Sequence, residues 1–501
     1  MAKLDPEFRA ALEAAFNHAV SHLENLDQTA VAATADLETL RARINKSLAH
    51  DGVAPDEVIH DLVADVTGGL LGSAGGRFFG WVIGGALPAA VAADWLTSTW
   101  QQNSALYACS PAAAVVEETV GIWLKEILGL PEHASFALVT GCQMAHVTCL
   151  AAARHALLKK HGWDVELQGM FGAPAIRILS SSECHGSFER AVRLLGFGQS
   201  QVKLLPVDDE GRLIPEALED ELKKDAAAPT LVLLQAGDIN IGAYDSFETL
   251  IPIAHASKAW VHVDGAFGLW AGASPHLRRR VKGIDAADSW ATDGHKWLNV
   301  PFDSGFAFVA DPESHRASLS IRAAYLTHAA DARDQVDWNP EWSRRARGFP
   351  AYAALRQLGR DGVAEMIDRC CRHAHSLTMR IGALPGAEVL WEPTINQGLV
   401  RFLAAESPSA LSGLDGLRNQ ETPRVGTPNL PAEEDHDRRT DEVIAAILKT
   451  GEAFFGGTTW RGRRAMRISV TNWRTTDADV DRVVNAVAGV LRQVQNPDVW
   501  G

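Results

Sequence analysis

The sequence is poor in cysteine and contains no long uninterrupted run of apolar residues. Six cysteines among 501 residues do not form a disulfide framework, so we expect a reduced protein located in the cytoplasm. The uncharged, glycine-rich stretch at residues 78–93 is interrupted by Pro88 and is shorter than the roughly 20 residues of a membrane-spanning helix. The opening residues, MAKLDPEFRA, lack the apolar core of a signal peptide. We therefore expect neither secretion nor a membrane partner.

Basic residues are also in the minority. The net charge of −15 disfavours nucleic acid or an anionic membrane as the main partner, because both repel a negative surface. Apolar residues make up 47% and charged residues 22% of the chain, which is the balance of an ordinary globular protein. A chain of 501 residues is long enough for two or three packed units.

The chain divides into three predicted regions. Residues 1–85 are expected to form a helical arm, which begins at Asp5-Pro6 and carries apolar residues at helical spacing. Residues 86–362 alternate apolar strands with helices, which is typical of a mostly parallel α/β sheet flanked by helices. Residues 363–501 are predicted to be a small α+β domain. Within it, residues 406–434 are rich in Ser, Pro and Gly and predict an exposed loop.

The strand and helix predictions can be stated by residue number. In the large region the expected strands are 136–141, 175–181, 201–207, 229–237, 258–268 and 304–310. In the third region the segments AEVLWEP, GLVRFLA and AMRISVTN predict strands, and 441–448 and 477–493 predict helices.

Residues able to do chemistry follow these strands, where parallel sheets bind their ligands. They are Asp264, His185, the Gly141–Gln143 turn that opens a helix, Asp238, and Lys296 after residues 289–293. A lysine can form a Schiff base with a carbonyl cofactor, and a helix N-terminus can bind phosphate. A carboxylate can keep a pyridine nitrogen protonated, and an imidazole can stack on the ring. Together these residues predict pyridoxal 5'-phosphate as the cofactor.

Several segments resemble the pyridoxal-dependent group II amino-acid decarboxylases, which include the aromatic-L-amino-acid, histidine and glutamate decarboxylases. These segments are DSWATDGHKWLNVPFDSGFAF, HVDGAFG, ECHGSFERA, and AAYLTHA with WSRRARG. The resemblance runs from GRFFGWVIGG to MRISVTNWRTT. It implies a fold-type I enzyme, a lyase that removes CO2 from an L-amino acid. It also implies a homodimer with shared active sites, in which the arm of residues 1–85 wraps the partner.

The resemblance assigns a role to each residue that would meet the cofactor ring or its phosphate. Lys296 would form the Schiff base and Asp264 would bond the pyridine nitrogen, while His185 and Ala266 would contact the two ring faces. The phosphate would lie near four further residues, which are Cys142, Gln143, Asp293 and His295. Gln143 replaces the hydroxyl residue of the family, and Asp293 stands where many relatives have Asn. Asp238 would touch the ring or the surroundings of His185.

Tyr325 is one of only four tyrosines, and it lies in the polar segment IRAAYLTHAADARDQ. In the family a tyrosine at this place sits on a mobile loop and reaches the neighbouring subunit's site. There it returns a proton to the substrate carbon after CO2 leaves. Relatives with Phe at this position tend to release aldehydes, so Tyr325 favours simple decarboxylation.

The substrate is predicted from the segment RFFGWVIGGALP, which in the family lines the side-chain pocket. Trp81 and Val82 would form an apolar wall and Gly84 would leave room, so we expect an aromatic L-amino acid. Arg77 would instead suit an acidic side chain if it faced inward. Open alternatives are an acidic or small amino acid such as glutamate, aspartate or diaminobutyrate, and an aldehyde synthase or carbon–carbon lyase. A non-enzymatic scaffold is disfavoured because the site residues are all present.

One other segment, RCCRHAH at residues 369–375, resembles a metal-binding cluster. Cys371 and His375 would share a helical face, but no second ligand pair stands nearby at zinc spacing. We expect a structural helix there and no metal.

Overall fold

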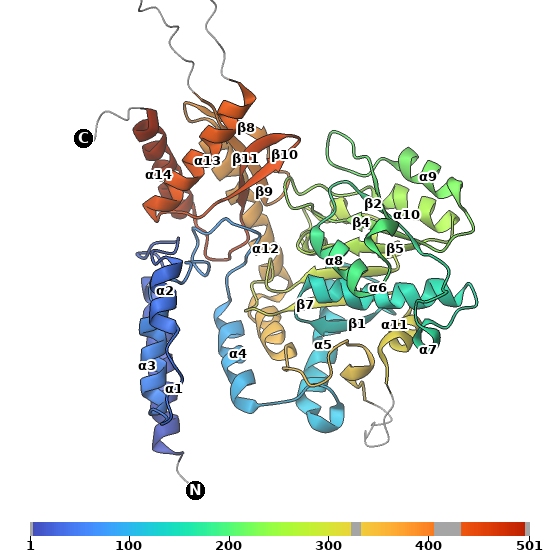
Figure 1. The fold of residues 1–501 in the computed structure, drawn as a ribbon, viewed down its shortest axis with the longest axis horizontal. Coiled ribbons are helices and arrows are strands. Elements are labelled where there is room, and N and C mark those ends of the chain that lie inside the picture. Colours follow the sequence, from blue (N-terminus) through green and yellow to red (C-terminus); the bar gives the residue numbers. More distant parts are fainter. Residues whose placement is uncertain (1–3, 322–331, 405–431, 496–501) are drawn as a thin grey trace, which may run out of the picture.

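The computed structural model describes residues 4–321, 332–404 and 432–495. It consists of an N-terminal group of helices, a large unit built on seven strands and a smaller unit built on four strands (Figure 1). Tyr325 and nearly all of the predicted loop at residues 406–434 fall outside the described residues.

The large unit is built on a sheet with the strand order β1-β7-β6-β5-β4-β2-β3. Strand β7 is antiparallel to β1 and β6, and the other neighbouring pairs are parallel, which confirms the predicted α/β class. The central strands are short apolar runs buried on both faces, as expected for a parallel sheet covered by helices. The strands are β1 (Ser135–Val139), β2 (Arg177–Ser181), β3 (Val202–Leu205), β4 (Thr230–Gln235), β5 (Trp260–Asp264), β6 (Ser289–Asp293) and β7 (Gly305–Val309).

Alternate residues of the central strands pack against opposite layers of helices. In β4, Leu231 and Leu233 belong to the core beneath α6 (Cys142–Lys159) and α8 (Gly186–Leu194). Val232 and Leu234 belong to the core on the other face. Four of the helices that contribute to this second core are α5 (Pro111–Leu128), α9 (Pro215–Lys224), α10 (Phe247–Ala256) and α12 (Gly348–Gly382). Two short helices complete the unit, α7 (Val165–Gln168) and α11 (Pro312–Leu319).

The smaller unit is an antiparallel sheet with the order β10-β11-β9-β8, packed against α12, α13 (Glu433–Thr450) and α14 (Asp477–Gln495). Its strands are β8 (Ala387–Trp391), β9 (Gln397–Phe402), β10 (Gly456–Trp460) and β11 (Arg463–Ser469). Strand β10 was not predicted, since it begins with two glycines. The predicted loop extends too far, because residues 433–434 already belong to α13. The Asp435 carboxylate caps that helix by accepting the Ala432 N–H at 3.2 Å.

Helix α12 connects the two sheets, and the predicted domain boundary at residue 362 falls inside it. Gly359 interrupts the helix with a φ of 63°, a conformation that glycine adopts without strain.

The N-terminal helices are α1 (Pro6–Asn25), α2 (Leu37–Ile44) and α3 (Pro55–Val66), and α1 packs along α3. Helix α1 begins where the sequence predicts, since Asp5 accepts the Glu7 N–H at 2.9 Å and Pro6 opens the first turn. Helix α4 (Pro88–Trp100) follows and packs on α12. None of the described helices is both long and apolar enough to span a membrane.

Candidate functional site

A cavity of about 370 Å³ lies at the carboxyl ends of the parallel strands. Most of the predicted site residues line it. They are Cys142, Gln143, His185, Asp264, Ala266, Asp293, His295 and Lys296. Residues that follow different strands and are far apart in the chain therefore meet in one cavity.

Lys296 lies in the turn between β6 and β7, three residues after Asp293. Its Nζ is 3.1 Å from Asp293 Oδ2. Burial opposes the ammonium charge, but Asp293 and the other nearby acidic groups outweigh burial and raise the pKa of Lys296. Two backbone hydrogen bonds fix this turn, because the N–H groups of Gly294 and His295 both donate to the Ser304 carbonyl.

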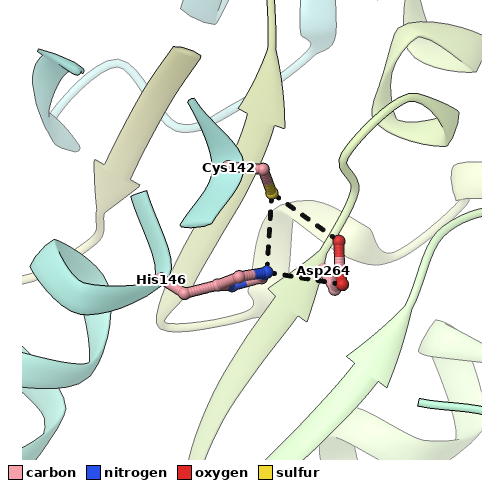
Figure 2. Close-up of side chains that lie close together, drawn as sticks. All are labelled: Cys142, His146 and Asp264. Atoms are coloured by element: carbon pink, nitrogen blue, oxygen red, sulfur yellow. Dashed lines mark hydrogen bonds and ion pairs between the residues drawn. The ribbon is translucent and has the colours of Figure 1, made fainter. Parts of the chain in front are cut away.

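Asp264 is the last residue of β5 and faces Cys142 and His146 from α6 (Figure 2). Its Oδ1 accepts the Ala266 N–H at 3.1 Å, and its Oδ2 lies 3.4 Å from His146 Nε2. Burial would raise the pKa of this carboxyl. His146, His185 and Lys296 outweigh burial and hold the pKa well below its usual range, so Asp264 is a buried carboxylate.

The N-terminus of α6 faces the same cavity. Gly141 caps the helix, and the Cys142 N–H donates to Asp293 Oδ1 at 2.6 Å. A Cβ at Gly141 would lie 3.0 Å from the His295 ring, so the turn and this ring are tightly packed. The Gln143 side chain contributes an Nε2 that is buried and has no hydrogen-bond partner. A helix N-terminus with an unpartnered buried donor is suited to an anion.

His185 caps α8 at the mouth of the cavity. Its Nδ1 accepts the Ser187 N–H at 3.3 Å and lies 2.7 Å from Ser187 Oγ, so the ring proton is assigned to Nε2. Partial burial lowers the pKa of His185, which keeps the imidazole neutral near pH 7. A neutral ring is the form that stacks most easily on another aromatic ring.

Asp238 does not line the cavity. Its carboxylate accepts N–H groups from its own loop, at 2.8 Å from Asn240, 3.2 Å from Ile241 and 2.6 Å from Ala243. The side chain therefore shapes the segment after β4, whose Ile239 does reach the cavity.

The predicted substrate-pocket residues lie apart from the cavity in the single chain. Trp81 is 52% exposed and packs on Phe454, with ring centroids 5.0 Å apart, whereas Val82 is buried in the large core. Gly84 lies against the backbone of Lys296. Arg77 is 2% exposed and faces away from the cavity.

Arg77 instead holds the N-terminal helices to the smaller unit. Its Nη1 donates to the Glu452 carbonyl at 2.5 Å, and its Nη2 donates to the Asp27 carbonyl at 3.0 Å. A Glu452 oxygen 3.3 Å away balances its charge. The inward-facing arginine that would suit an acidic substrate is therefore not Arg77.

A family model described as the pyridoxal-dependent decarboxylase conserved domain matches residues 38–404. The chain belongs to the pyridoxal-dependent decarboxylase family. The aromatic-L-amino-acid decarboxylase of Bacillus atrophaeus is 25% identical over 484 residues, which cover 95% of this chain and 93% of the relative. The acidic amino acid decarboxylase GADL1 of Xenopus tropicalis is 29% identical over 364 residues, which cover 71% and 70%.

The fold of this decarboxylase also matches solved structures. The crystal structure of Oryza sativa TDC with PLP and tryptamine aligns with a TM-score of 0.87 at 22% identity, covering 99% of this chain and 100% of the other. The protein is thus a pyridoxal-phosphate-dependent amino-acid decarboxylase, as predicted. Its relatives carry the names of different substrates, so the comparisons leave the amino acid open.

The residues of the decarboxylase cavity fit pyridoxal phosphate. The N-terminus of α6 and the unpartnered Gln143 Nε2 offer donors to a phosphate. Asp264 offers a carboxylate to the ring nitrogen, Lys296 offers an amine to the carbonyl, and His185 lies at the mouth beside them.

Some cavity residues of the decarboxylase were not predicted. Ser187, Gln235 and Phe267 also line it, and each lies close to a strand end that the sequence had marked. His146 was missed as well, although its spacing from Cys142 places the two on one face of α6. The sequence carries no signal for Arg467, because only the packing of β11 brings it to the Ile239 carbonyl, 3.3 Å away.

The donor atoms of Cys142, His146 and Asp264 lie within 4.8 Å of one another, close enough to hold a metal ion. Burial and the neighbouring carboxylates hold the pKa of the Cys142 thiol well above its usual range. A thiol must lose its proton to bind a metal, and Lys296 already lies nearby as a cation, so the chemistry of this group disfavours a metal.

Proposed function

We propose that this decarboxylase converts an aromatic L-amino acid, such as tryptophan, tyrosine or phenylalanine, into the amine and CO2. The observation that carries the proposal is the convergence of Lys296, Asp264 and His185 on one cavity. The aromatic preference is supported by Arg77, whose charge is used between the N-terminal helices and the smaller unit.

Each of the cavity residues has a separate role in this reaction. Pyridoxal phosphate, when bound, supplies a ring that accepts the electrons of the breaking bond between Cα and the carboxylate. Lys296 would hold the cofactor through its amine. Asp264, charged despite its burial, would hold a proton at the ring nitrogen. His185 would border the ring, and the buried Phe267 helps to exclude water, which favours loss of a charged carboxylate as neutral CO2.

We also propose that Tyr325 of the neighbouring subunit donates the proton to Cα. This role is supported by the family resemblance, since Tyr325 lies outside the described residues. Tyr325→Phe is expected to shift the products from amine toward aldehyde and ammonia. A variant that still forms only amine at the normal rate would contradict the role and would reopen the aldehyde synthase and lyase alternatives.

A homodimer is proposed because α1 presents apolar side chains to solvent. Phe8, Leu12 and Phe16 are 55%, 47% and 54% exposed, which is unusual for a free surface. Replacement of Phe8 and Phe16 by Ser is expected to convert the dimer to a monomer by light scattering. An active monomeric wild-type protein would contradict the shared site.

A second candidate is an acidic amino acid, and Arg467 is the observation that favours it. Its guanidinium is 8% exposed, its Nε has no partner, and it lies beside the cavity-lining Ile239. Asp238 lies close enough to offset part of its charge. If glutamate or aspartate is the preferred substrate, Arg467→Met should abolish that preference.

The deciding experiment measures amine formation from a panel of aromatic, acidic and diamino acids. Purified protein should absorb visible light after addition of pyridoxal phosphate, and borohydride should trap the cofactor on Lys296. Lys296→Arg keeps the positive charge and should lose both the adduct and the activity. Fast turnover of glutamate or aspartate alone would overturn the aromatic proposal.

A further inference from the structure

A line of buried polar side chains runs away from the cavity behind Asp264. Trp260, His262 and Asp264 are alternate residues of β5 and therefore point to the same face of the sheet. Ser289 is the residue of β6 that pairs with His262, and His146 reaches the same face from α6. The four groups behind the carboxylate are almost completely buried and lie away from bulk water.

The contacts in this line are continuous. Trp260 Nε1 lies 2.9 Å from Ser289 Oγ, which lies 2.9 Å from His262 Nδ1. His262 Nε2 lies 2.9 Å from His146 Nδ1, and His146 Nε2 lies 3.4 Å from Asp264 Oδ2. Every ring nitrogen of both histidines therefore has a partner.

The chemistry of the groups limits the roles along the line. An indole N–H can only donate, so Ser289 Oγ accepts from Trp260. Burial and the neighbouring His146 lower the pKa of His262 to about 3, so this ring is neutral and has one donor nitrogen and one acceptor nitrogen. An ionised carboxylate can only accept, so the His146 Nε2 that faces Asp264 Oδ2 is the donor of that contact.

We propose that Trp260, Ser289, His262 and His146 form a continuous hydrogen-bond relay that positions Asp264 and keeps it ionised toward the cofactor's ring nitrogen. His146 is thus a positioning residue. The inference rests on the proposed role of Asp264. A carboxylate taken from water needs donors, and the relay supplies one to Oδ2 while the Ala266 N–H supplies one to Oδ1.

Aromatic packing encloses the two histidines of the relay. Phe188 packs on both imidazoles, edge-on to His146 at 6.1 Å and stacked on His262 at 6.5 Å between ring centroids. The other titratable groups that face Asp264 are Cys142 from α6, Cys184 and His185 from the turn before α8, and Lys296 after β6. None of these groups bonds to Ser289, so a change at Ser289 reaches Asp264 only through the two histidines.

The test uses the holoenzyme and two matched serine variants. Ser289→Ala removes the bond to His262, and Ser135→Ala removes an equally short serine–histidine bond, 2.8 Å to His315, in β1 of the same sheet. Ser289→Ala is expected to weaken pyridoxal phosphate binding by about threefold. The acid-side loss of the visible band should also move to higher pH, because Asp264 takes up a proton more easily. Ser135→Ala should leave both measurements unchanged.

His146 is tested directly with two variants. His146→Leu removes the last donor and should weaken cofactor binding by about tenfold. His146→Gln keeps an N–H near the position of Nε2 and should recover part of the loss. Wild-type cofactor affinity and pH profile in both Ser289→Ala and His146→Gln would overturn the relay. Failure of the wild-type protein to bind pyridoxal phosphate would instead overturn the proposed function.

Discussion

Gly84 shows how one missing side chain lets two segments of the backbone approach each other at Lys296. A Cβ at this residue would collide with the Lys296 carbonyl oxygen, whereas one at Gly489 would meet nothing within 4 Å. Gly84→Ala is therefore expected to lower the free energy of unfolding by about 2 kcal/mol and to weaken the cofactor adduct at Lys296. Urea unfolding and borohydride trapping measure the two effects. Gly489→Ala is the control, and equal behaviour of the two variants would contradict the close approach.

The buried side chain of Gln143 is expected to lower the stability of the apoprotein and to strengthen cofactor binding. Its Nε2 is buried without a partner, which costs about 1 kcal/mol in the absence of an anion. Gln143→Met keeps the shape of the side chain and removes that donor. The apoprotein should become more stable by about 1 kcal/mol. Cofactor affinity, measured by absorption titration, should fall. An apoprotein that loses stability, or an unchanged affinity, would count against the phosphate role.

Helix α5 and the start of the large sheet are joined by a fully buried ion pair. Arg344 Nη2 donates to both carboxylate oxygens of Glu117, each group is 1% exposed, and Arg344 Nη1 also donates to the Leu138 carbonyl in β1. Glu117→Gln leaves the guanidinium buried without its counter-charge, which should cost about 3 kcal/mol in urea unfolding.

The same helix offers the control for that substitution. Glu126 pairs with Arg360 at a site where both side chains are 58% exposed. Glu126→Gln should change stability little, because water replaces the lost partner. Similar losses of stability in Glu117→Gln and Glu126→Gln would show that burial does not determine how much the Glu117–Arg344 pair stabilises the protein.

Helix α11 carries His315, a buried histidine that makes the free energy of unfolding depend on pH. His315 bonds Ser135 Oγ and the Trp338 carbonyl, and burial together with Arg333 lowers its pKa to about 3. Below pH 6.5, the ordinary pKa of histidine, the unfolded chain takes up a proton at His315 while the folded chain does not. Acidification therefore lowers the free energy of unfolding through His315. His315→Gln should therefore cost about 2 kcal/mol less at pH 5 than at pH 6.5. A pH-independent difference in urea unfolding would contradict this.

The elements of the large sheet could be predicted because their signals are local. Strand β5 is a short buried run that ends in a carboxylate, and its sequence shows both facts. Strand β10 could not be predicted, since the two glycines at its start have no strand preference and the β11 ladder supplies the stability. His146 shows a different limit. Its helix was predicted, but its contact with Asp264 depends on how α6 crosses β5.

At the scale of the whole molecule, Arg77 joins three segments that are distant in sequence. It is expected to hold the N-terminal helices in place and to take no part in substrate choice. Arg77→Met should lower the free energy of unfolding by about 3 kcal/mol and make residues before 66 more sensitive to protease. The ratio of aromatic to acidic turnover should not change. A changed ratio of aromatic to acidic turnover would indicate that Arg77 contributes to the substrate pocket.

The two sheets fall on either side of the border proposed from the sequence. The seven strands lie within residues 86–362 and the four strands lie within residues 363–501. The proposed border at residue 362 lies within α12, because one long helix contributes to the cores of both sheets. Composition cannot reveal such a border, since the apolar spacing of the helix continues across it. The substrate pocket stays a prediction, because Trp81 and Val82 do not line the cavity within one chain.

The continuity of the hydrogen bonds behind Asp264 has a consequence for the history of this protein. Each side chain in the line bonds to the next, so a mutation at one position leaves a buried polar atom of its neighbour without that partner. Substitutions there should be epistatic, and a lineage that exchanges His146 should also have exchanged His262 or Ser289. These four side chains would then be inherited as a unit, while the residues of the outer helices drift independently.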